Sequence, residues 1–220
     1  MTDKKKRVGI LISGRGSNMV SLIEAARDPG YPAAIACVIS NRPEAEGLAK
    51  AHDAGIKTQT VDHAHFKSRT DFEAALDGAL CESGVELVAC AGFMRLMTPD
   101  FVERWRDRML NIHPSLLPAF RGLHTHERVL AAGVKITGCT VHIVRPEMDE
   151  GPIVAQAAVP VLDGDTVERL AARVLEAEHK LYPHALALFA SGRVQIAGEK
   201  AVGPQVSINQ EKALFCPPLA

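Results

Sequence analysis

The chain has 220 residues, 47% of them hydrophobic, and its formal net charge at pH 7 is -1. This length and composition suit one compact domain, 1–220, with a sizeable core, and the balanced charge provides no basic field that would hold DNA or tRNA. A small-molecule substrate is therefore favoured over a nucleic acid.

The cysteines and the N-terminus bear on the compartment of the protein. The five cysteines are odd in number, scattered and without a C-x-x-C pair: Cys37, Cys81, Cys90, Cys139 and Cys216. Such cysteines are typical of reduced thiols in the cytoplasm. No apolar run reaches the ~20 residues of a membrane-spanning helix, and the basic run 4–7 leads directly into a strand-like segment. We expect neither export nor a membrane partner.

Short aliphatic or β-branched runs alternate with stretches of helical periodicity in the first half of the chain. The predicted strands are 8–12, 34–40, 57–61, 87–91 and 109–112, and the predicted helices are 18–26, 43–54, 70–83 and 99–106. Strands that alternate with helices indicate βαβ units. The sequence therefore predicts an α/β fold with a Rossmann-like, mostly parallel sheet flanked by helices.

The pattern changes after residue 135. Two strand-like runs, 138–144 and 153–161, are joined by the turn-rich segment 146–152, and we expect them to add antiparallel strands to the sheet. A long helix is predicted over 166–190, with a capping-box-like start at Asp165 and Glu168. Glu178 falls in register with its apolar stripe, which aims a carboxylate inward. The remainder is expected to be a loosely packed tail with an edge strand near Val194.

The turn 13–18, with sequence SGRGSN, connects the first strand directly to a helix. Glycines let the backbone approach an anion, and a helix N-terminus offers unpaired N–H groups. Met19 replaces the third glycine of the dinucleotide fingerprint, and the Gly-Lys-Ser/Thr of a Walker loop is missing. Phosphate binding and a plain turn capped by Ser17 or Asn18 both stay open.

Asn111 and His113 lie at the end of the fifth predicted strand, where open parallel sheets bind ligands. Alternation places both side chains on the same side of the strand. The amide can stabilise an oxyanion and the imidazole can exchange a proton near neutral pH, although a structural histidine would show the same pattern. Asp149, in the turn 146–152, is either a turn former or a carboxylate that orients His113.

Other chemistries fit the sequence less well. The histidines 113, 124, 126 and 142 have poor zinc spacing, because an H-x-H in a glycine-rich loop lacks a nearby cysteine, so no metal is predicted. His142 alternates with the apolar residues 139, 141 and 143 and is expected on the opposite sheet face. A serine hydrolase is not indicated, since the G-x-S-x-G elbow is missing.

The sequence resembles the glycinamide ribonucleotide formyltransferase family in five separated blocks: LISGRGSN, AGFMRLM, LNIHPSLLPAFRGLHTH, MDEGPI and EAEHKLYP. The resemblance extends from Val8 to about Arg193. It implies a cytoplasmic monomer or homodimer that transfers the formyl group of 10-formyltetrahydrofolate to the amino group of 5'-phosphoribosylglycinamide. The product would be the formylglycinamide ribonucleotide of de novo purine biosynthesis.

The resemblance also implies roles for residues. Asn111 and His113 would stabilise a tetrahedral oxyanion and Asp149 would assist proton transfer. The ribotide would bind Gly16, Ser17, Asn18 and Glu178. The folate would bind Arg69, Met94, Arg95, Leu96, Met97, Asn111, Arg145, Pro146, Glu147, Met148 and Asp149. We therefore divide the domain into a phosphate-binding half (about 7–106), a folate and catalytic half (about 107–197) and a tail (198–220). Arg15 and the pair Arg145-Pro146 depart from the family pattern.

Three alternative functions compete with this one. A methionyl-tRNA formyltransferase would need a further basic C-terminal domain. A formyltetrahydrofolate deformylase would carry an extra N-terminal domain, whereas the first strand here begins by residue 8. A non-catalytic nucleotide-binding module would explain the glycine turn but would give Asn111, His113 and Asp149 no task.

Overall fold

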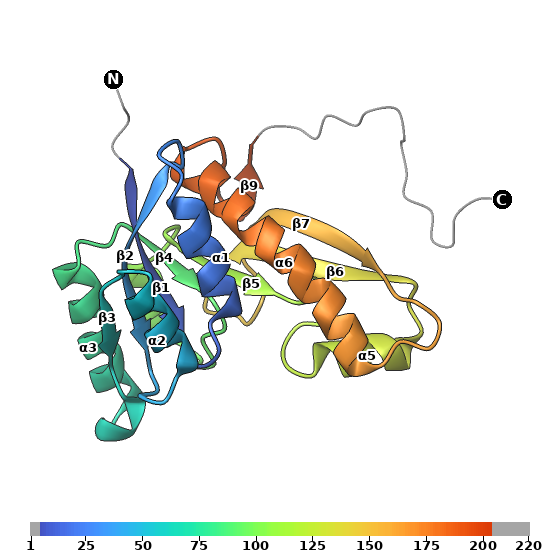
Figure 1. Cartoon of the computed structure of the whole chain (residues 1–220), viewed down its shortest axis with the longest axis horizontal. Coiled ribbons are helices and arrows are strands. Elements are labelled where there is room, and N and C mark those ends of the chain that lie inside the picture. Colours follow the sequence, from blue (N-terminus) through green and yellow to red (C-terminus); the bar gives the residue numbers. More distant parts are fainter. Residues whose placement is uncertain (1–4, 204–220) are drawn as a thin grey trace.

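A seven-stranded sheet forms the centre of the protein, in a computed structural model that describes residues 5–203 (Figure 1). Its strand order is β3-β2-β1-β4-β5-β6-β7, in which β1 to β5 run parallel and β6 and β7 are antiparallel additions. The predicted fold class is confirmed. The strands are β1 (Lys6–Ile12), β2 (Ala33–Ser40), β3 (Thr58–Thr60), β4 (Leu87–Cys90), β5 (Met109–His113), β6 (Ile136–Ile143) and β7 (Ile153–Pro160).

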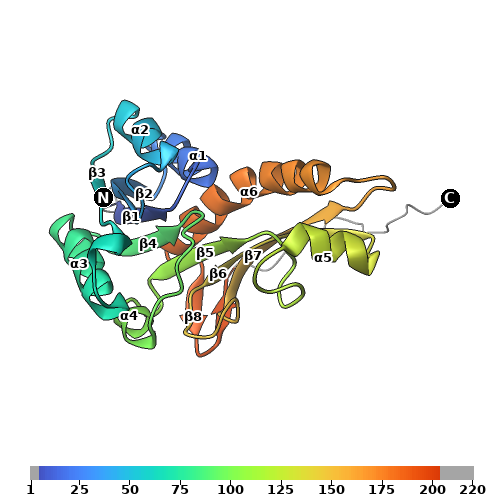
Figure 2. The same cartoon turned by 90° about the horizontal axis from the view of Figure 1, so that it is seen from below.

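Helices cover both faces of this sheet, as the two views in Figures 1 and 2 show. One face is covered by α1 (Ser17–Ala26), α2 (Glu46–Asp53) and α6 (Val167–Ala190), and the other by α3 (Arg69–Glu82) and α4 (Pro99–Arg104). Two further elements were not predicted: α5 (Thr125–Ala132), which packs on α6, and a 3-10 turn, η1 (His63–His65). Each face of the sheet therefore has its own apolar core.

The structure corrects the ends of two predicted helices. The helix predicted over 43–54 begins only at Glu46, because residues 43 and 44 form a turn and Ala45 is extended. The helix predicted over 99–106 ends at Arg104. Asp107 takes a left-handed conformation (φ 55°), which turns the chain out of the helix and into β5.

The start of α6 also differs from the expected capping box. Thr166 is the N-cap, and its hydroxyl accepts the backbone N–H of Arg169. Asp165 instead accepts two hydrogen bonds from Arg173, at 2.7 and 2.9 Å. Further along α6, the fully buried Tyr182 donates its hydroxyl to the carbonyl oxygens of Cys90, at the end of β4, and Leu110, near the start of β5. The helix is thereby fixed against the strands that carry the candidate catalytic residues.

The C-terminal part of the described chain is a two-stranded antiparallel hairpin of β8 (Gln195–Ala197) and β9 (Lys200–Val202). The strand expected near Val194 is present, but the expected loose tail is wrong for residues 198–203, because Glu199 forms ion pairs with Arg106 and Arg145. The rest of the predicted tail, 204–220 with Cys216, lies outside the described residues. Within residues 5–203, no helix combines the length and the apolar character needed to cross a bilayer.

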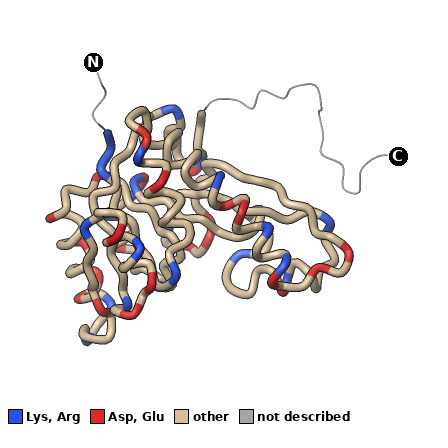
Figure 3. The backbone as a smooth tube through the Cα atoms, viewed as in Figure 1, with Lys and Arg blue, Asp and Glu red and all other residues tan. Residues whose placement is uncertain are grey.

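Charged residues of both signs are interspersed over most of the backbone (Figure 3). This mixture of signs along the described residues agrees with the net charge of -1.

Candidate active site

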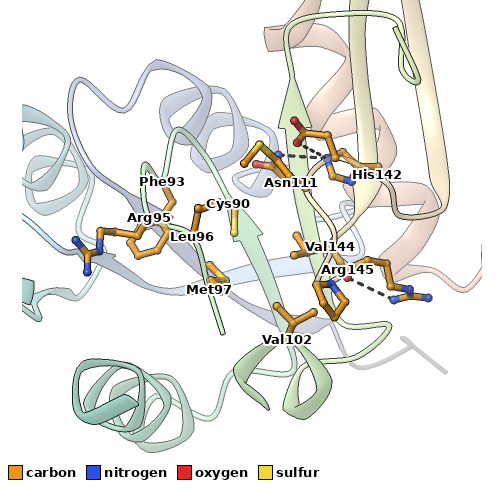
Figure 4. Close-up of a pocket in the computed structure, with 13 residues that line it drawn as sticks. Cys90, Phe93, Arg95, Leu96, Met97, Val102, Asn111, His142, Val144 and Arg145 are labelled. Atoms are coloured by element: carbon orange, nitrogen blue, oxygen red, sulfur yellow. Dashed lines mark hydrogen bonds and ion pairs between the residues drawn. The ribbon is translucent and has the colours of Figure 1, made fainter. Parts of the chain in front are cut away.

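Three adjoining cavities open at the carboxyl ends of β1, β4 and β5. The main cavity, of about 660 Å³, contains Asn111, His113 and Asp149 in its lining. It shares Asn111, Asp149 and other lining residues with an inner cavity of about 150 Å³ (Figure 4). It shares Gly92 and Met94 with a glycine-turn cavity of about 230 Å³ beside residues 13–18. The candidate residues of both halves of the chain therefore surround one continuous region.

Asn111 and His113 both contribute to the lining of the main cavity, as strand alternation predicted. They lie on β5 opposite His142 and Thr140 of β6, in the antiparallel part of the sheet. The His113 side chain is only 7% exposed, so its ring nitrogens have to find partners within the protein.

Asp149 approaches His113, the contact that the sequence left open. Its Oδ2 lies 3.4 Å from His113 Nδ1 and accepts the Gly122 N–H at 2.8 Å. On the other side of the ring, His113 Nε2 donates to the Phe120 carbonyl oxygen at 3.0 Å. Both ring nitrogens thus face oxygen acceptors, an arrangement in which the imidazolium satisfies both.

His142 is a site residue whose contacts sequence reasoning missed. It lies on the sheet face that the alternation predicted, where its Nε2 accepts from Asn111 Nδ2 at 3.2 Å and its Nδ1 donates to the Ile143 carbonyl at 3.0 Å. Burial lowers the pKa of His142, which keeps the ring neutral at pH 7 with the proton on Nδ1. The neutral ring therefore fixes the orientation of the Asn111 amide, with its NH2 group toward His142 Nε2.

The backbone around the site takes unusual conformations. Among residues 5–203, four non-glycine residues have φ near +55°, and three of them border the site: Phe120, His124 and Asp149. A left-handed non-glycine residue is held in place only when its surroundings determine it. This concentration of strain at one place is typical of a functional site.

The glycine turn lacks the side-chain cap that the plain-turn interpretation required. Gly16 is the N-cap of α1, with φ 68° and no capping side chain, so the alternative of a plain turn capped by Ser17 or Asn18 does not hold. A Cβ at Gly16 would lie 3.0 Å from Gly47 Cα, so both the conformation and the space require glycine. The first N–H groups of α1 are consequently left for a ligand in the glycine-turn cavity.

Glu178 points inward from α6, as its register predicted. It is 7% exposed, and its Oε2 accepts from Asn18 Nδ2 at 2.7 Å, while the buried Asn18 Oδ1 has no partner. Burial raises the pKa of Glu178, and the hydrogen bond from Asn18 partly offsets this effect. A carboxylate and an unsatisfied amide oxygen thus meet behind the glycine turn.

The residues predicted to bind folate are divided between the cavities and the surface. The inner or the main cavity is lined by Met94, Arg95, Leu96, Met97, Asn111, Arg145, Pro146, Met148 and Asp149. Arg69, at the start of α3, and Glu147 are exposed and line neither cavity. The Arg145 guanidinium pairs with Asp107 and Glu199.

Exposed apolar side chains surround the mouth of the main cavity. Met94, Leu96, Leu123 and Met148 are 48–72% exposed and all line it. Exposed apolar groups gathered at a cavity are typical of a binding site for a flat organic ligand. No group of three or more His, Cys, Asp or Glu in the part of the chain that the structure describes is arranged to hold a metal ion.

An α/β sheet with an amide, an imidazole and a carboxylate at one cavity, beside an anion-binding turn, defines an enzyme of the acyl-group transfer class. Residues 6–186 match the family described as formyl transferase. The chain belongs to this family, whose members use folate-derived formyl donors. The resemblance found in the five sequence blocks is confirmed.

Three of the relatives indicate the branch of the family. The chain is 41% identical to the phosphoribosylglycinamide formyltransferase of Escherichia coli, over 85% of this chain and 88% of that protein. It is 57% identical to the phosphoribosylglycinamide formyltransferase of Brucella melitensis, whose crystal structure superposes with a TM-score of 0.83 over 88% of this chain and 100% of that one. It is also 52% identical, over 87% of its length, to the trifunctional purine biosynthetic protein adenosine-3 of Gallus gallus, of which it spans only 19%.

Proposed function

We propose that the protein transfers the formyl group of 10-formyltetrahydrofolate to the amino group of 5'-phosphoribosylglycinamide in de novo purine biosynthesis. The observation that carries this proposal is the meeting of Asn111, His113 and Asp149 where an apolar-rimmed cavity adjoins the glycine-turn cavity. Its partners are then two small molecules, and neither nucleic acid nor membrane is needed. We place this activity in the cytoplasm, in a monomer or homodimer.

The two substrates would enter from opposite sides of the catalytic trio, which consists of Asn111, His113 and Asp149. The ribotide phosphate would bind the N–H groups of Gly16, Ser17 and Asn18, which lack a side-chain cap. Glu178 would contact the same substrate from α6. The flat ring system of the folate would lie in the inner cavity, between the loop 93–97 and the loop 144–149, with its formyl group toward Asn111.

The reaction joins the substrate amine nitrogen to the formyl carbon and then breaks the bond from that carbon to the folate nitrogen. Asn111 Nδ2 and the His113 imidazolium would stabilise the tetrahedral oxyanion between the two steps. Removing one such donor costs about 3 to 4 kcal/mol in transition-state stabilisation. The proton that the amine loses would reach the folate nitrogen through Asp149 and a water molecule.

His113 would exchange one hydrogen bond during this cycle. Its Nε2–H donates to the Phe120 carbonyl, and the oxyanion would take over that proton donor when the substrates bind. The Nδ1 side would keep Asp149 as its partner, so the ring would stay oriented. Transfer of one N–H from a carbonyl oxygen to an oxyanion strengthens the bond as charge develops.

A two-substrate assay tests the proposal. The protein is mixed with 10-formyltetrahydrofolate, with and without 5'-phosphoribosylglycinamide, and the tetrahydrofolate and the formylated ribotide are quantified. Ribotide-dependent formation of both products supports the proposal. Release of formate without the ribotide indicates a deformylase, and ligand binding without turnover indicates a non-catalytic module.

Two histidine variants sharpen this assay. His113→Ala should lose at least about 100-fold in turnover while it stays folded, because it removes both an oxyanion donor and the partner of Asp149. His52→Ala is the matched control, since the His52 side chain is 80% exposed on α2. Normal turnover of the His113 variant would refute the assignment.

A further inference from the structure

We infer that Glu199, in the turn of the C-terminal hairpin, is a positioning residue that holds two walls of the inner cavity together for the formyl donor. The inference rests on the proposed function, because it assigns the inner cavity to the folate. It goes further because it gives one structural role to two features, the β8–β9 hairpin and Arg145, which departs from the family pattern.

One carboxylate joins three segments that lie far apart in the sequence. Glu199 Oε1 accepts from Arg106 Nη2 at 2.9 Å, and Glu199 Oε2 accepts from Arg145 Nε at 2.8 Å. Arg106 follows α4, and Arg145 follows β6. Both bonds are charge-assisted, the stronger kind of hydrogen bond in proteins.

The two arginines belong to segments that both contribute to the walls of the inner cavity. Val102 of α4 lines one wall and precedes Arg106, which lies just after the end of this helix. The other wall is the loop 144–149, which begins with Val144, Arg145 and Pro146. Figure 4 shows Val102 and Arg145 at the same end of the cavity, away from Asn111 and His142. A link from Arg106 through Glu199 to Arg145 therefore sets the separation of the walls at this end.

Arg145 anchors its loop to the protein and does not offer a charge to the cavity. Its side chain is only 5% exposed, and its Nη2 also donates to Asp107 Oδ1 at 2.7 Å. Because two carboxylates accept hydrogen bonds from this guanidinium, we expect it to keep these partners and not to turn toward a ligand. A buried cation that loses one partner is strongly destabilised in place, so the loop would rearrange if Glu199 were removed.

The far end of the same loop is held independently. Asp149 accepts the Gly122 N–H and contacts His113, neither of which touches Glu199. At Gly151, a Cβ would lie 1.7 Å from the Ile143 carbonyl oxygen, so the return of the chain into β7 is tightly packed. Loosening the near end should widen the folate cavity while the catalytic trio stays assembled. Binding of the donor should therefore change more than turnover.

The test compares Glu199→Ala with the matched control Glu103→Ala. Glu103 pairs with the same Arg106, at 2.6 Å, and its side chain is 50% exposed against 60% for Glu199, but it does not pair with Arg145. Tetrahydrofolate alone is titrated into each protein to obtain its Kd. The KM of each substrate and kcat are then measured, with the melting temperature as a check on folding.

We expect Glu199→Ala to raise the Kd of tetrahydrofolate and the KM of the donor by roughly 3- to 30-fold, the size of effect that residues coupled to a site without touching the ligand produce. The ribotide KM and kcat should stay within about twofold of wild type on the same grounds. Glu199→Gln, which keeps an acceptor oxygen, should give a smaller rise, and Glu103→Ala should give none.

An unchanged tetrahydrofolate Kd in Glu199→Ala, with or without a lower melting temperature, would overturn the inference, because a merely structural hairpin gives that result. An equal rise in Glu103→Ala would overturn it too. The titration needs no turnover. A wild-type protein that binds tetrahydrofolate but does not formylate the ribotide would thus count against the proposed function and leave the comparison of the variants intact.

Discussion

Replacing Asp149 by asparagine tests the negative charge of the catalytic trio separately from its geometry, because asparagine has nearly the same shape as aspartate. Asp149 Oδ2 both contacts His113 Nδ1 and accepts the Gly122 N–H, whereas Oδ1 lies 3.7 Å from His142 Nε2. In Asp149→Asn, the amide oxygen can take the place of Oδ2. The amide NH2 then lies near His142 Nε2, whose lone pair already accepts from Asn111 Nδ2. The hydrogen bonds survive and only the negative charge is lost.

The structure sets the size of the effect. The carboxylate and the imidazole are separated by 3.4 Å and their side chains are 11% and 7% exposed. At an effective dielectric constant of about 20, two unit charges at this separation attract each other by about 5 kcal/mol. A proton-transfer group contributes about 100- to 10,000-fold to the rate, which corresponds to roughly 3 to 5 kcal/mol. We therefore expect kcat to fall by about 100- to 10,000-fold.

The assay is steady-state formyl transfer with both substrates, together with circular dichroism and thermal melting of each variant. Glu150→Gln is the control, because it removes the neighbouring carboxylate, which is exposed and pairs with Arg121. The KM values of Asp149→Asn should change little, since the loop keeps its hydrogen bonds. A kcat within a few-fold of wild type would show that the charge of Asp149 is not used.

Three further predictions concern the oxyanion, pH and packing. Asn111→Ala should lower kcat by about 100- to 1,000-fold with a normal melting curve, and a normal kcat would contradict its donor role. Because burial raises the pKa of Glu178, the folded protein binds that proton more tightly than the unfolded chain does, so this group lowers stability as pH rises above 4.5. In urea unfolding, Glu178→Gln should therefore gain on wild type between pH 5 and pH 8, and parallel pH profiles would contradict this. Gly138→Ala should lose at least about 3 kcal/mol in the same assay, since its Cβ would lie 1.9 Å from the Ala157 carbonyl oxygen. Gly78→Ala, in an open part of α3, should instead gain about 0.5 to 1 kcal/mol.

Local periodicity was sufficient to predict the parallel half of the fold. Strands β1 to β5 lie within one or two residues of the predicted runs, because buried parallel strands are short aliphatic segments between helices. The placement of the Asn111 and His113 side chains on the same side of β5 can be predicted in the same way, since side chains alternate along any strand. These features need no information from distant parts of the chain.

Features that depend on register or on distant partners were beyond the sequence. His142 lies opposite Asn111 because β5 and β6 pair antiparallel, and the connection 114–135 does not specify that register. Helix α5 was missed because its N-cap, His124, is left-handed and provides no capping side chain, so the usual start signal is missing.

Arg145 shows the same limit for a single side chain. The family resemblance implied a folate contact for this residue, and it does line the inner cavity. Its guanidinium, however, is held by Asp107 and by Glu199, which lies 54 residues further along the chain. The direction of a long charged side chain depends on which opposite charges the fold brings near it, and sequence spacing does not contain that information.

The long helix α6 determines how far the two halves of the site stand apart. Glu178 and Tyr182 are four residues apart and therefore lie on the same face of the helix. Glu178 accepts from Asn18 at the glycine turn, while Tyr182 donates to the carbonyl oxygens of Cys90 in β4 and Leu110 in β5. One helical turn thus connects the turn proposed to hold the phosphate with the strand that carries Asn111 and His113. A shift of α6 along its axis would displace both contacts together, so we expect this helix to set the separation between the glycine turn and the strand that carries Asn111 and His113.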